Sequence, residues 1–460
     1  MSRLGSSPRL GAALLCGALA ACGEPMTLSL VVTPGHEEDA LSRAPAVATI
    51  EIVASSPDGE ILRTASAPPG GSFDLGEVPS TQLLDFELRG LDAGGQLVAR
   101  GRSVTVPIGA IDADAGVELP LFLQRLGESA RPPGALSVSH LRAPAAIFGE
   151  RYVLLSGGER ALDASGAEVD RASSAFYDLL AWGGATGGAL PRRAASLVVR
   201  GSSVLLIDAS GASWVDLSTG TSSEAAAPPG LDFADVAGGR TIDGLAGLSF
   251  VVGATRDGAP TSAVLVVDEA GGLAAASLGT ARSRAGASFV ATRGLVVTGG
   301  SALGAGAELV SSDGTSTQPL PYASDATTGA AAVALAGGGV VLLAGGRLAG
   351  VAAPTRTLDL DCIASCVPTV LDELAVPALA SRGLGYEAAT TTLLAGEGDD
   401  GETLLFELEP TASPPVRALP LRERRSGATV APAPNGTLFV LGGELVGGGA
   451  ALRVESVFPR

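Results

Sequence analysis

The sequence predicts an all-β protein in which a seven-bladed β-propeller follows a small β-sandwich. The main observation is a short apolar run ending in a glycine doublet, or in a remnant of one, that recurs through the last three quarters of the 460 residues. The seven copies place the first position of the doublet at Gly157, Asp208, Gly253, Gly299, Gly345, Gly396 and Gly442. Steps of 45 to 51 residues are typical of propeller blades, whose apolar faces are covered by neighbouring blades.

The last copy shows the strand order of one unit most clearly. An Asn435-Gly436 turn joins two apolar segments into a hairpin, and residues 451–457 form a third strand. The chain then ends one strand short of a four-stranded unit. We expect residues 134–140, a spare strand ahead of the first copy, to complete the last blade. The propeller would then span residues 134–460 and leave no long exposed edge.

Residues 26–126 carry a different pattern. Alternating segments at 27–32, 48–53 and 84–88 approximate the two-residue period of half-buried strands, and turns rich in proline and glycine separate them. About seven short strands in about 100 residues predict a small β-sandwich of the immunoglobulin-like or transthyretin-like kind. We interpret it as a spacer between the propeller and a membrane, with a second binding module as the alternative.

The N-terminus has the features of an export signal. Two arginines precede an apolar stretch over residues 10–19, which is too short to span a bilayer, and small residues then precede Cys22. This segment resembles the lipobox of bacterial lipoproteins. The resemblance implies a lipoprotein signal peptide over residues 1–21 and a lipidated N-terminus over residues 22–25, with acyl chains on Cys22. An ordinary secretory signal with an unrelated cysteine is the alternative.

The residue after this cysteine bears on which membrane holds the chain. The best-known inner-membrane retention signal of the lipoprotein family is an Asp at this position, and here it is Gly23. The resemblance therefore implies an outer-membrane lipoprotein of the cell envelope, on the periplasmic or the surface side. No later apolar run approaches roughly 18 residues, so the lipid is the membrane attachment that the sequence predicts.

The charge of the chain limits its partners. After removal of Arg3 and Arg9 with the signal peptide, 48 acidic residues stand against 28 arginines, a net charge of −20. A protein this acidic repels nucleic acid and anionic lipid surfaces, so no nucleic-acid partner is expected. All basic residues are arginine and none is lysine, a skew that resembles the codon bias of a GC-rich genome and carries no functional information.

Two cysteines remain after export and lipidation. Cys362 and Cys366 lie in a predicted turn, and in an exported protein such a pair indicates a local disulfide. A metal site would need two more good ligands, and the two histidines, His36 and His140, are distant in sequence. We therefore expect no metal and no other cofactor.

The strand order around the glycine doublets resembles that of Kelch-like and galactose-oxidase-like propellers. Kelch units usually carry a Tyr and a Trp after the doublet, and here Tyr177 with Trp182, and Trp214, lie near such places. The resemblance implies the fold of residues 134–460. It leaves blades two, three and six in doubt, because their doublets are degenerate. Copper oxidases of this architecture use two histidines and two tyrosines, and the single propeller histidine excludes that chemistry.

Five arginines repeat in phase with the blades. They are Arg142, Arg193, Arg284, Arg382 and Arg425, which lie 14 to 17 residues ahead of their doublets. Equivalent positions of a propeller fall on one ring, so the spacing predicts guanidinium groups around one face. One interpretation is structural, with each arginine bonding a neighbouring blade. The other is an anion-binding ring for a phosphate, carboxylate or acidic sugar.

Three functional hypotheses remain at this point. We favour a non-catalytic, lipid-anchored binding or scaffold protein whose propeller loops hold a protein or glycan partner. The alternative is a carbohydrate-active enzyme with a carboxylate pair in the central depression, for which the acids Asp359, Asp361, Asp399 and Asp400 are available. The third is a purely structural envelope lipoprotein. No catalytic residue is assigned.

Overall fold

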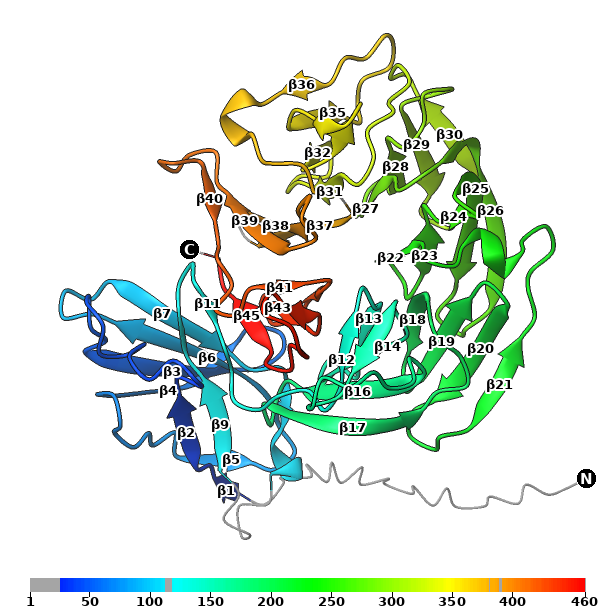
Figure 1. Cartoon of the computed structure of the whole chain (residues 1–460). Coiled ribbons are helices and arrows are strands. Elements are labelled where there is room, and N and C mark those ends of the chain that lie inside the picture. Colours follow the sequence, from blue (N-terminus) through cyan, green and yellow to red (C-terminus); the bar gives the residue numbers. More distant parts are fainter. Residues whose placement is uncertain (1–24, 112–117, 380, 389–390, 460) are drawn as a thin grey trace, which may run out of the picture.

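The computed structural model describes residues 25–111, 118–379, 381–388 and 391–459, and in these ranges strands form nearly all regular structure (Figure 1). The predicted signal peptide and Cys22 lie outside the described residues. Three short 3-10 helices interrupt the strands: η1 (Ile108–Ala110), η2 (Phe233–Asp235) and η3 (Asp372–Leu374). Among the described residues, no helix has the length and apolar character to cross a membrane.

The N-terminal part is built on one antiparallel sheet with smaller strand pairs packed against it. The sheet has the order β10 (Gln124–Arg125), β7 (Leu97–Arg102), β6 (Leu83–Leu91), β3 (Thr49–Ser55) and β4 (Ile61–Ala67), with β8 (Val106–Pro107) also beside β6. The smaller pairs are β1 (Pro25–Thr27) with β5 (Glu77–Pro79), and β2 (Leu30–Thr33) with β9 (Leu119–Phe122). Alternate residues of β6, such as Phe86 and Leu88, are buried in the shared core. The predicted sandwich is thus confirmed.

Seven further antiparallel sheets, which we number as blades 1 to 7 in chain order, follow one another around a common axis (Figure 1). Blade 1 is β13 (Ala145–Phe148), β14 (Tyr152–Ser156), β16 (Ser173–Asp178) and β17 (Gly183–Ala189); blade 2 is β18 (Ser196–Arg200), β19 (Ser203–Asp208), β20 (Gly211–Asp216) and β21 (Ser222–Ala225). Blade 3 is β22 (Arg240–Asp243), β23 (Ser249–Val252), β25 (Ala259–Val267) and β26 (Leu273–Arg282), with β24 (Thr255–Arg256) also on β25.

The remaining blades have the same order. Blade 4 is β27 (Gly286–Val290), β28 (Gly294–Thr298), β29 (Ala307–Ser311) and β30 (Thr317–Leu320); blade 5 is β31 (Ala331–Ala334), β32 (Val340–Ala344), β35 (Arg356–Asp359) and β36 (Thr369–Val370). Blade 6 is β37 (Ser381–Ala388), β38 (Thr391–Glu397), β39 (Thr403–Leu408) and β40 (Val416–Ala418). Blade 7 is β42 (Thr429–Pro432), β43 (Leu438–Leu441), β45 (Glu455–Val457) and β11 (Ser129–Ala130). The predicted all-β propeller is therefore confirmed. Blade 2 pairs without a register shift, whereas the strand pairing shifts between β25 and β26 in blade 3 and between β37 and β38 in blade 6.

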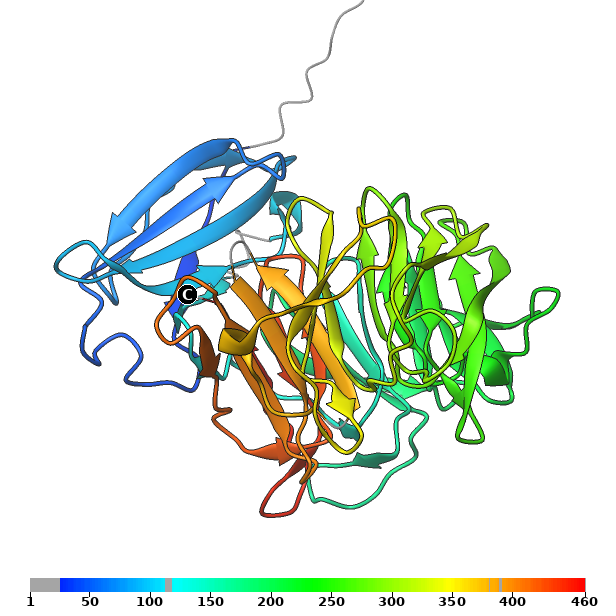
Figure 2. The same cartoon turned by 90° about the horizontal axis from the view of Figure 1, so that it is seen from above.

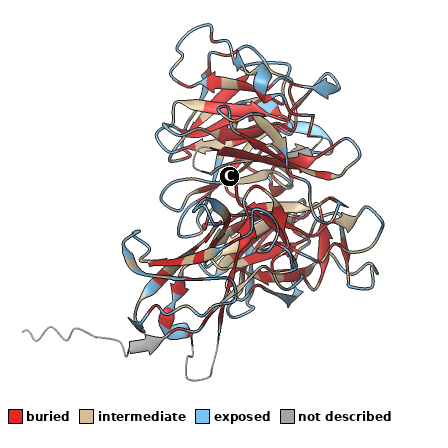
Figure 3. Cartoon of the chain, turned by 90° about the vertical axis from the view of Figure 1, so that its left-hand side faces the viewer, coloured by how far each residue is buried: buried red, intermediate tan, exposed pale blue. Residues whose placement is uncertain are grey.

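Three short strand pairs among the described residues of the propeller lie outside the seven blade sheets. The pairs are β12 (Ser139–Leu141) with β15 (Arg160–Leu162), β33 (Arg347–Leu348) with β34 (Val351–Ala352), and β41 (Arg425–Ser426) with β44 (Glu444–Leu445). Figure 3 shows buried residues concentrated in the strands and exposed ones in the loops. Separate apolar clusters fill the spaces between neighbouring blades, as expected when each blade covers the next.

The strand that closes the ring differs from the one predicted. Closure comes from β11, which pairs antiparallel with β45 through Ser129 and Ala130, and the prediction for residues 134–140 is wrong. The chain turns at Gly134, whose φ is +77°, and a Cβ there would lie 2.3 Å from the carbonyl oxygen of Trp182. The following residues therefore cross to blade 1, where β12 pairs with β15.

The sandwich packs directly on blades 1 and 7 at the rim of the ring and extends past one face of it (Figures 1 and 2). Phe122 of the sandwich meets Trp182 of blade 1 with ring centroids 5.3 Å apart. The indole Nε1 of Trp182 donates to the carbonyl oxygen of Pro120 at 3.0 Å, and the hydroxyl of Tyr177 donates to that of Pro133 at 2.8 Å. Trp182 thus joins the sandwich to blade 1, and Tyr177 holds the segment that follows β11.

Candidate functional site

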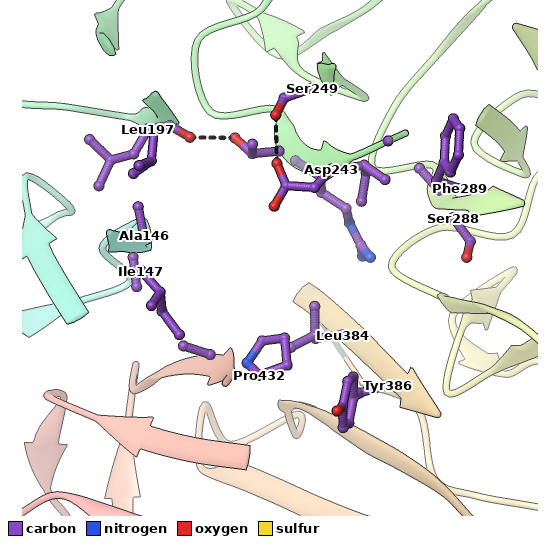
Figure 4. A pocket seen from close by; sticks show the side chains of 18 of the residues that line it. Ala146, Ile147, Leu197, Asp243, Ser249, Ser288, Phe289, Leu384, Tyr386 and Pro432 are labelled. Atoms are coloured by element: carbon purple, nitrogen blue, oxygen red, sulfur yellow. Dashed lines mark hydrogen bonds between the residues drawn. The ribbon is translucent and has the colours of Figure 1, made fainter. Parts of the chain in front are cut away.

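A cavity of about 770 Å³ occupies the axis of the propeller (Figure 4). The innermost strand of every blade contributes to its wall. Most wall residues are apolar, among them Ile147, Leu197, Phe289, Leu384 and Pro432. The wall also carries polar and charged side chains, among them Thr241, Asp243 and Ser288. A concave site framed by rigid strands, with apolar surface and polar groups together, has the form of a small-molecule site.

Polar groups gather where the innermost strands end. The carboxylate of Asp243 accepts a hydrogen bond from the Ser249 hydroxyl at 2.5 Å (Figure 4). The guanidinium of Arg200 donates to the carbonyl oxygen of Val267 at 2.7 Å, and burial lowers the pKa of Arg200. Burial also raises the pKa of the Tyr386 hydroxyl. These side chains make the end of the cavity near the sandwich its polar mouth.

The sandwich forms part of the surroundings of this mouth. Glu150 and Pro434 line both the cavity and a second pocket of about 200 Å³ between sandwich and propeller. The side-chain amide of Asn435 donates to the carbonyl oxygen of Arg102 at 2.9 Å. The charge of Arg102 opposes the effect of burial on the pKa of Tyr386, which nevertheless stays raised. The sandwich therefore contributes charge at the entrance.

Arg240 spans the axis at the other end of the cavity. It is the first residue of β22, and its guanidinium donates to the carbonyl oxygens of Ala330, at 3.3 Å, and of Gly383. These acceptors precede or belong to the innermost strands of blades 5 and 6. A smaller pocket of about 190 Å³, lined by Glu397 and again by Arg240, lies beyond it. Arg240 thus lines both the cavity and the smaller pocket.

Arg142, Arg193, Arg284 and Arg425, which were predicted to form a ring, precede innermost strands and so lie toward one face. Their side chains, however, have different partners and different degrees of burial. Arg142 pairs with Glu397 at 2.8 Å and with Glu159 at 2.7 Å. Arg193 pairs with Asp170 at 3.1 Å, Arg284 is exposed, and Arg425 is fully buried. The side chain of Arg382 lies outside the described residues. This geometry favours the structural interpretation over a convergent anion site.

The sequence interpretation missed Arg282, which lies two residues before the predicted ring position Arg284. Arg282 is fully buried, pairs with Glu308 at 2.8 Å and donates to the carbonyl oxygen of Gly299 at 2.8 Å. Arg425 pairs with Glu455 at 2.9 Å and donates to the carbonyl oxygen of Gly442. Both arginines lie 17 residues before their glycine. That shared offset was the available signal, and Arg282, not Arg284, is the equivalent residue.

His140 occupies the same position in blade 1. It lies 17 residues before Gly157, and its Nδ1 is 3.1 Å from the carbonyl oxygen of that glycine. Since a carbonyl oxygen accepts, Nδ1 carries the proton. The Nε2 atom is buried without a hydrogen-bond partner among the described residues, and burial lowers the pKa of His140. The neutral imidazole is therefore the stable form at the junction of blades 7 and 1.

Acidification is expected to weaken the fold through His140. The unfolded histidine titrates near pH 6.5 and the folded one lower, so the unfolded state binds more protons in between and stability falls as the pH drops through that window. Urea unfolding at pH 7.5 and 5.0 checks this. The loss should be smaller in His140→Gln than in the wild type. His36→Gln measures the part of the loss that comes from the second histidine, whose pKa burial also lowers. Equal losses in the wild type and His140→Gln would contradict the assignment.

The other predicted site residues lie apart from the cavity. Cys362 and Cys366 form a disulfide in blade 5, with Cα atoms 6.0 Å apart. Asp361 pairs with Arg293 and Asp399 with Arg347, while Asp359 and Asp400 accept backbone N–H groups in turns. Within the described ranges, no group of three or more His, Cys, Asp or Glu side chains is placed to hold a metal ion.

Comparison with known proteins gives a distant likeness in fold. No family model matches the sequence. No curated protein matches it either. Similar solved structures include TolB from Acinetobacter baumannii, with 11% identity, a TM-score of 0.38 and coverage of 75% of this chain and 77% of that one. Another is oligogalacturonate lyase in complex with manganese, with 12% identity, a TM-score of 0.44 and coverage of 72% and 93%. The propeller fold of this chain rests on its own strand pairing, and the Kelch resemblance stays a prediction.

Proposed function

We propose that this chain is a non-catalytic binding protein of the bacterial cell envelope, anchored by lipid at Cys22, that holds a protein or glycan partner on one face of the propeller. The observation that carries the proposal is the position of the sandwich. It covers the turns that follow the innermost strands of blades 1 and 7, where Glu150, Pro434 and Asn435 lie.

The opposite face, where the innermost strands begin, is the one we assign to the partner. The first described strand, β1, belongs to the sandwich (Figure 1), so the predicted anchor joins the chain there. Rigid blades present the loops of the opposite face. We call this surface the open face and define it by Arg142, Glu159, Arg193 and Arg284.

The open face carries charge of both signs. The side chains of Arg193 and Asp170 form an exposed ion pair, and Glu159 is exposed beside Arg142. Such pairs contribute little to stability because water screens them. Their arginines and carboxylates remain accessible to the polar groups of a partner, which supports a binding role for this surface.

The anchor is tested by substitution of the cysteine. Cys22→Ser is expected to abolish incorporation of labelled palmitate and to move the protein from the membrane fraction to the soluble fraction, because one acylated cysteine supplies all chains. Cys16→Ser, within the predicted signal peptide, is the matched control. It should keep both the palmitate label and the location in the membrane fraction. Palmitate labelling of Cys22→Ser would contradict the lipidation proposal.

Site-specific photo-cross-linking tests the partner surface. A photoreactive amino acid at Arg284 or Glu159, both exposed on the open face, is expected to capture a specific envelope component in cells. The control position is Ile61, which is 63% exposed on edge strand β4 of the sandwich. Protease treatment of the captured species distinguishes a protein partner from a glycan. Equal capture from both surfaces would contradict the proposal.

A further inference from the structure

We propose that the outer edge of blade 5 is a second protein-binding surface, for a partner that presents an apolar pocket bordered by Lys or Arg. The surface consists of the exposed side chains of Ile363, Val367 and Val370, and we call it the blade 5 tip. This inference goes beyond the proposed function, because none of the residues that define the open face belongs to the tip. Strand β36, which carries Val370, lies at the rim of the ring and away from the sandwich (Figure 1).

The tip holds the two most exposed large apolar side chains of the described residues. Ile363 is 92% exposed and Val367 is 81% exposed, and the exposed Val370 follows them in the same short segment. Single exposed apolar residues are common on protein surfaces, but several in one short segment mark an interaction site. Burial of these side chains against a partner removes apolar surface from water, which favours association.

A disulfide and two hydrogen bonds hold the base of the tip. The bond between Cys362 and Cys366 closes a small loop. The backbone N–H of Cys366 donates to the carbonyl oxygen of Pro321 at 2.9 Å, and the hydroxyl of Tyr322 donates to that of Asp359 at 2.8 Å. Cys366 and Tyr322 are themselves buried in one apolar cluster. An apolar side chain on a fixed base loses less conformational freedom on binding, which suits an anchor residue.

The charge of the segment favours a basic partner. Residues 357–381 include four acidic residues and no arginine. Asp361 pairs with Arg293, whereas Asp372 and Glu373, just after Val370, are exposed and have no ion pair within the described ranges. Lys or Arg of a partner can pair with these two carboxylates, which adds specificity and speeds association. The same charges repel nucleic acid and anionic lipid. The segment has no aromatic side chain on which a sugar could stack, so we assign a protein to the tip.

Photo-cross-linking from the tip in intact cells tests the inference. The full chain carries a photoreactive amino acid at Ile363, and mass spectrometry identifies the residues that it captures. We expect a protein product whose captured segment contains apolar residues next to Lys or Arg. Capture of a lipid, a glycan, a second copy of this chain or a protein segment without Lys or Arg would overturn the proposal. A yield no higher than that from Ile61 on the sandwich would overturn it as well.

Two variants, each with the photoreactive residue kept at Ile363, test the chemistry of the contact. Val367→Ser removes a neighbouring apolar group and should lower the yield about tenfold, as loss of an anchor does. Asp372→Asn combined with Glu373→Gln removes two exposed charges and should lower it about threefold. These exposed side chains contribute little to folding. Ile61→Ser, the same kind of change on the sandwich, should leave the yield unchanged. An unchanged yield in either tip variant would overturn the proposal. Capture from the open face is measured separately, so either result can fail without the other.

Discussion

Arg425→Met is expected to lower the free energy of unfolding by about 3 to 5 kcal/mol, because it leaves a buried carboxylate without its cation. Arg425 and Glu455 are both fully buried and are 2.9 Å apart. The same guanidinium donates to the carbonyl oxygen of Arg453 at 2.8 Å. Glu455 also accepts from the backbone N–H of Arg422 at 2.7 Å. Loss of the Arg425 guanidinium therefore disturbs the hydrogen bonds that hold Glu455 and the loops of blade 7 together.

The matched control for this prediction is Arg193→Met. The pair of Arg193 with Asp170 is exposed, and exposed pairs contribute about 0 to 1 kcal/mol. Urea unfolding of both variants, followed by circular dichroism, gives the two losses. Similar small losses would mean that the buried pair does not hold the closing blade.

Gly157→Ala is expected to cost about 3 kcal/mol or more, from left-handed strain and a backbone clash together. The φ of Gly157 is +76°, and a Cβ would lie 1.8 Å from the carbonyl oxygen of Ala194. Ala194 lies just before β18, the innermost strand of blade 2, so the clash is with backbone that cannot move without shifting a blade.

Gly149→Ala separates the two causes. Gly149 has a φ of +55°, and a Cβ added there would have no neighbouring atom within 4 Å, so only the strain of about 1 to 2 kcal/mol applies. Thermal and urea unfolding of the two alanine variants give the difference. Equal losses would show that close approach between blades is not what requires glycine at Gly157.

The same contact explains why the doublets could be recognised in the sequence. A Cβ on the first glycine would approach backbone just before the next blade in other copies too: Gly299 faces the carbonyl oxygen of Thr327 at 2.5 Å, and Gly442 faces that of His140 at 2.6 Å. At Gly253 the nearest backbone atom is 3.6 Å away. Blade 3 nevertheless keeps Gly253, whose φ is +78°, and the residue that departs from the doublet is the second one, Ala254. The repeat was therefore readable at the first position, where a positive φ or a close backbone requires glycine.

Other features carried weaker signals. The closing strand β11 has two residues and no apolar alternation, so residues 134–140 looked more like a strand than residues 129–130. The repeating arginine position was predicted at 15 residues before the doublet, because that was the commonest spacing. The buried arginines lie 17 residues before it, as the spacing of Arg425 already indicated. Arg240 carried no signal, because its acceptors are main-chain oxygens of two blades distant in sequence.

Quantitative photo-cross-linking in intact cells tests the central claim, that a partner is held on the face opposite the sandwich, most directly. The yield of the specific product should be high from Arg284 and Glu159 and near background from Ile61 at equal expression. A higher yield from Ile61 than from the two open-face positions would contradict the account and assign the partner to the sandwich.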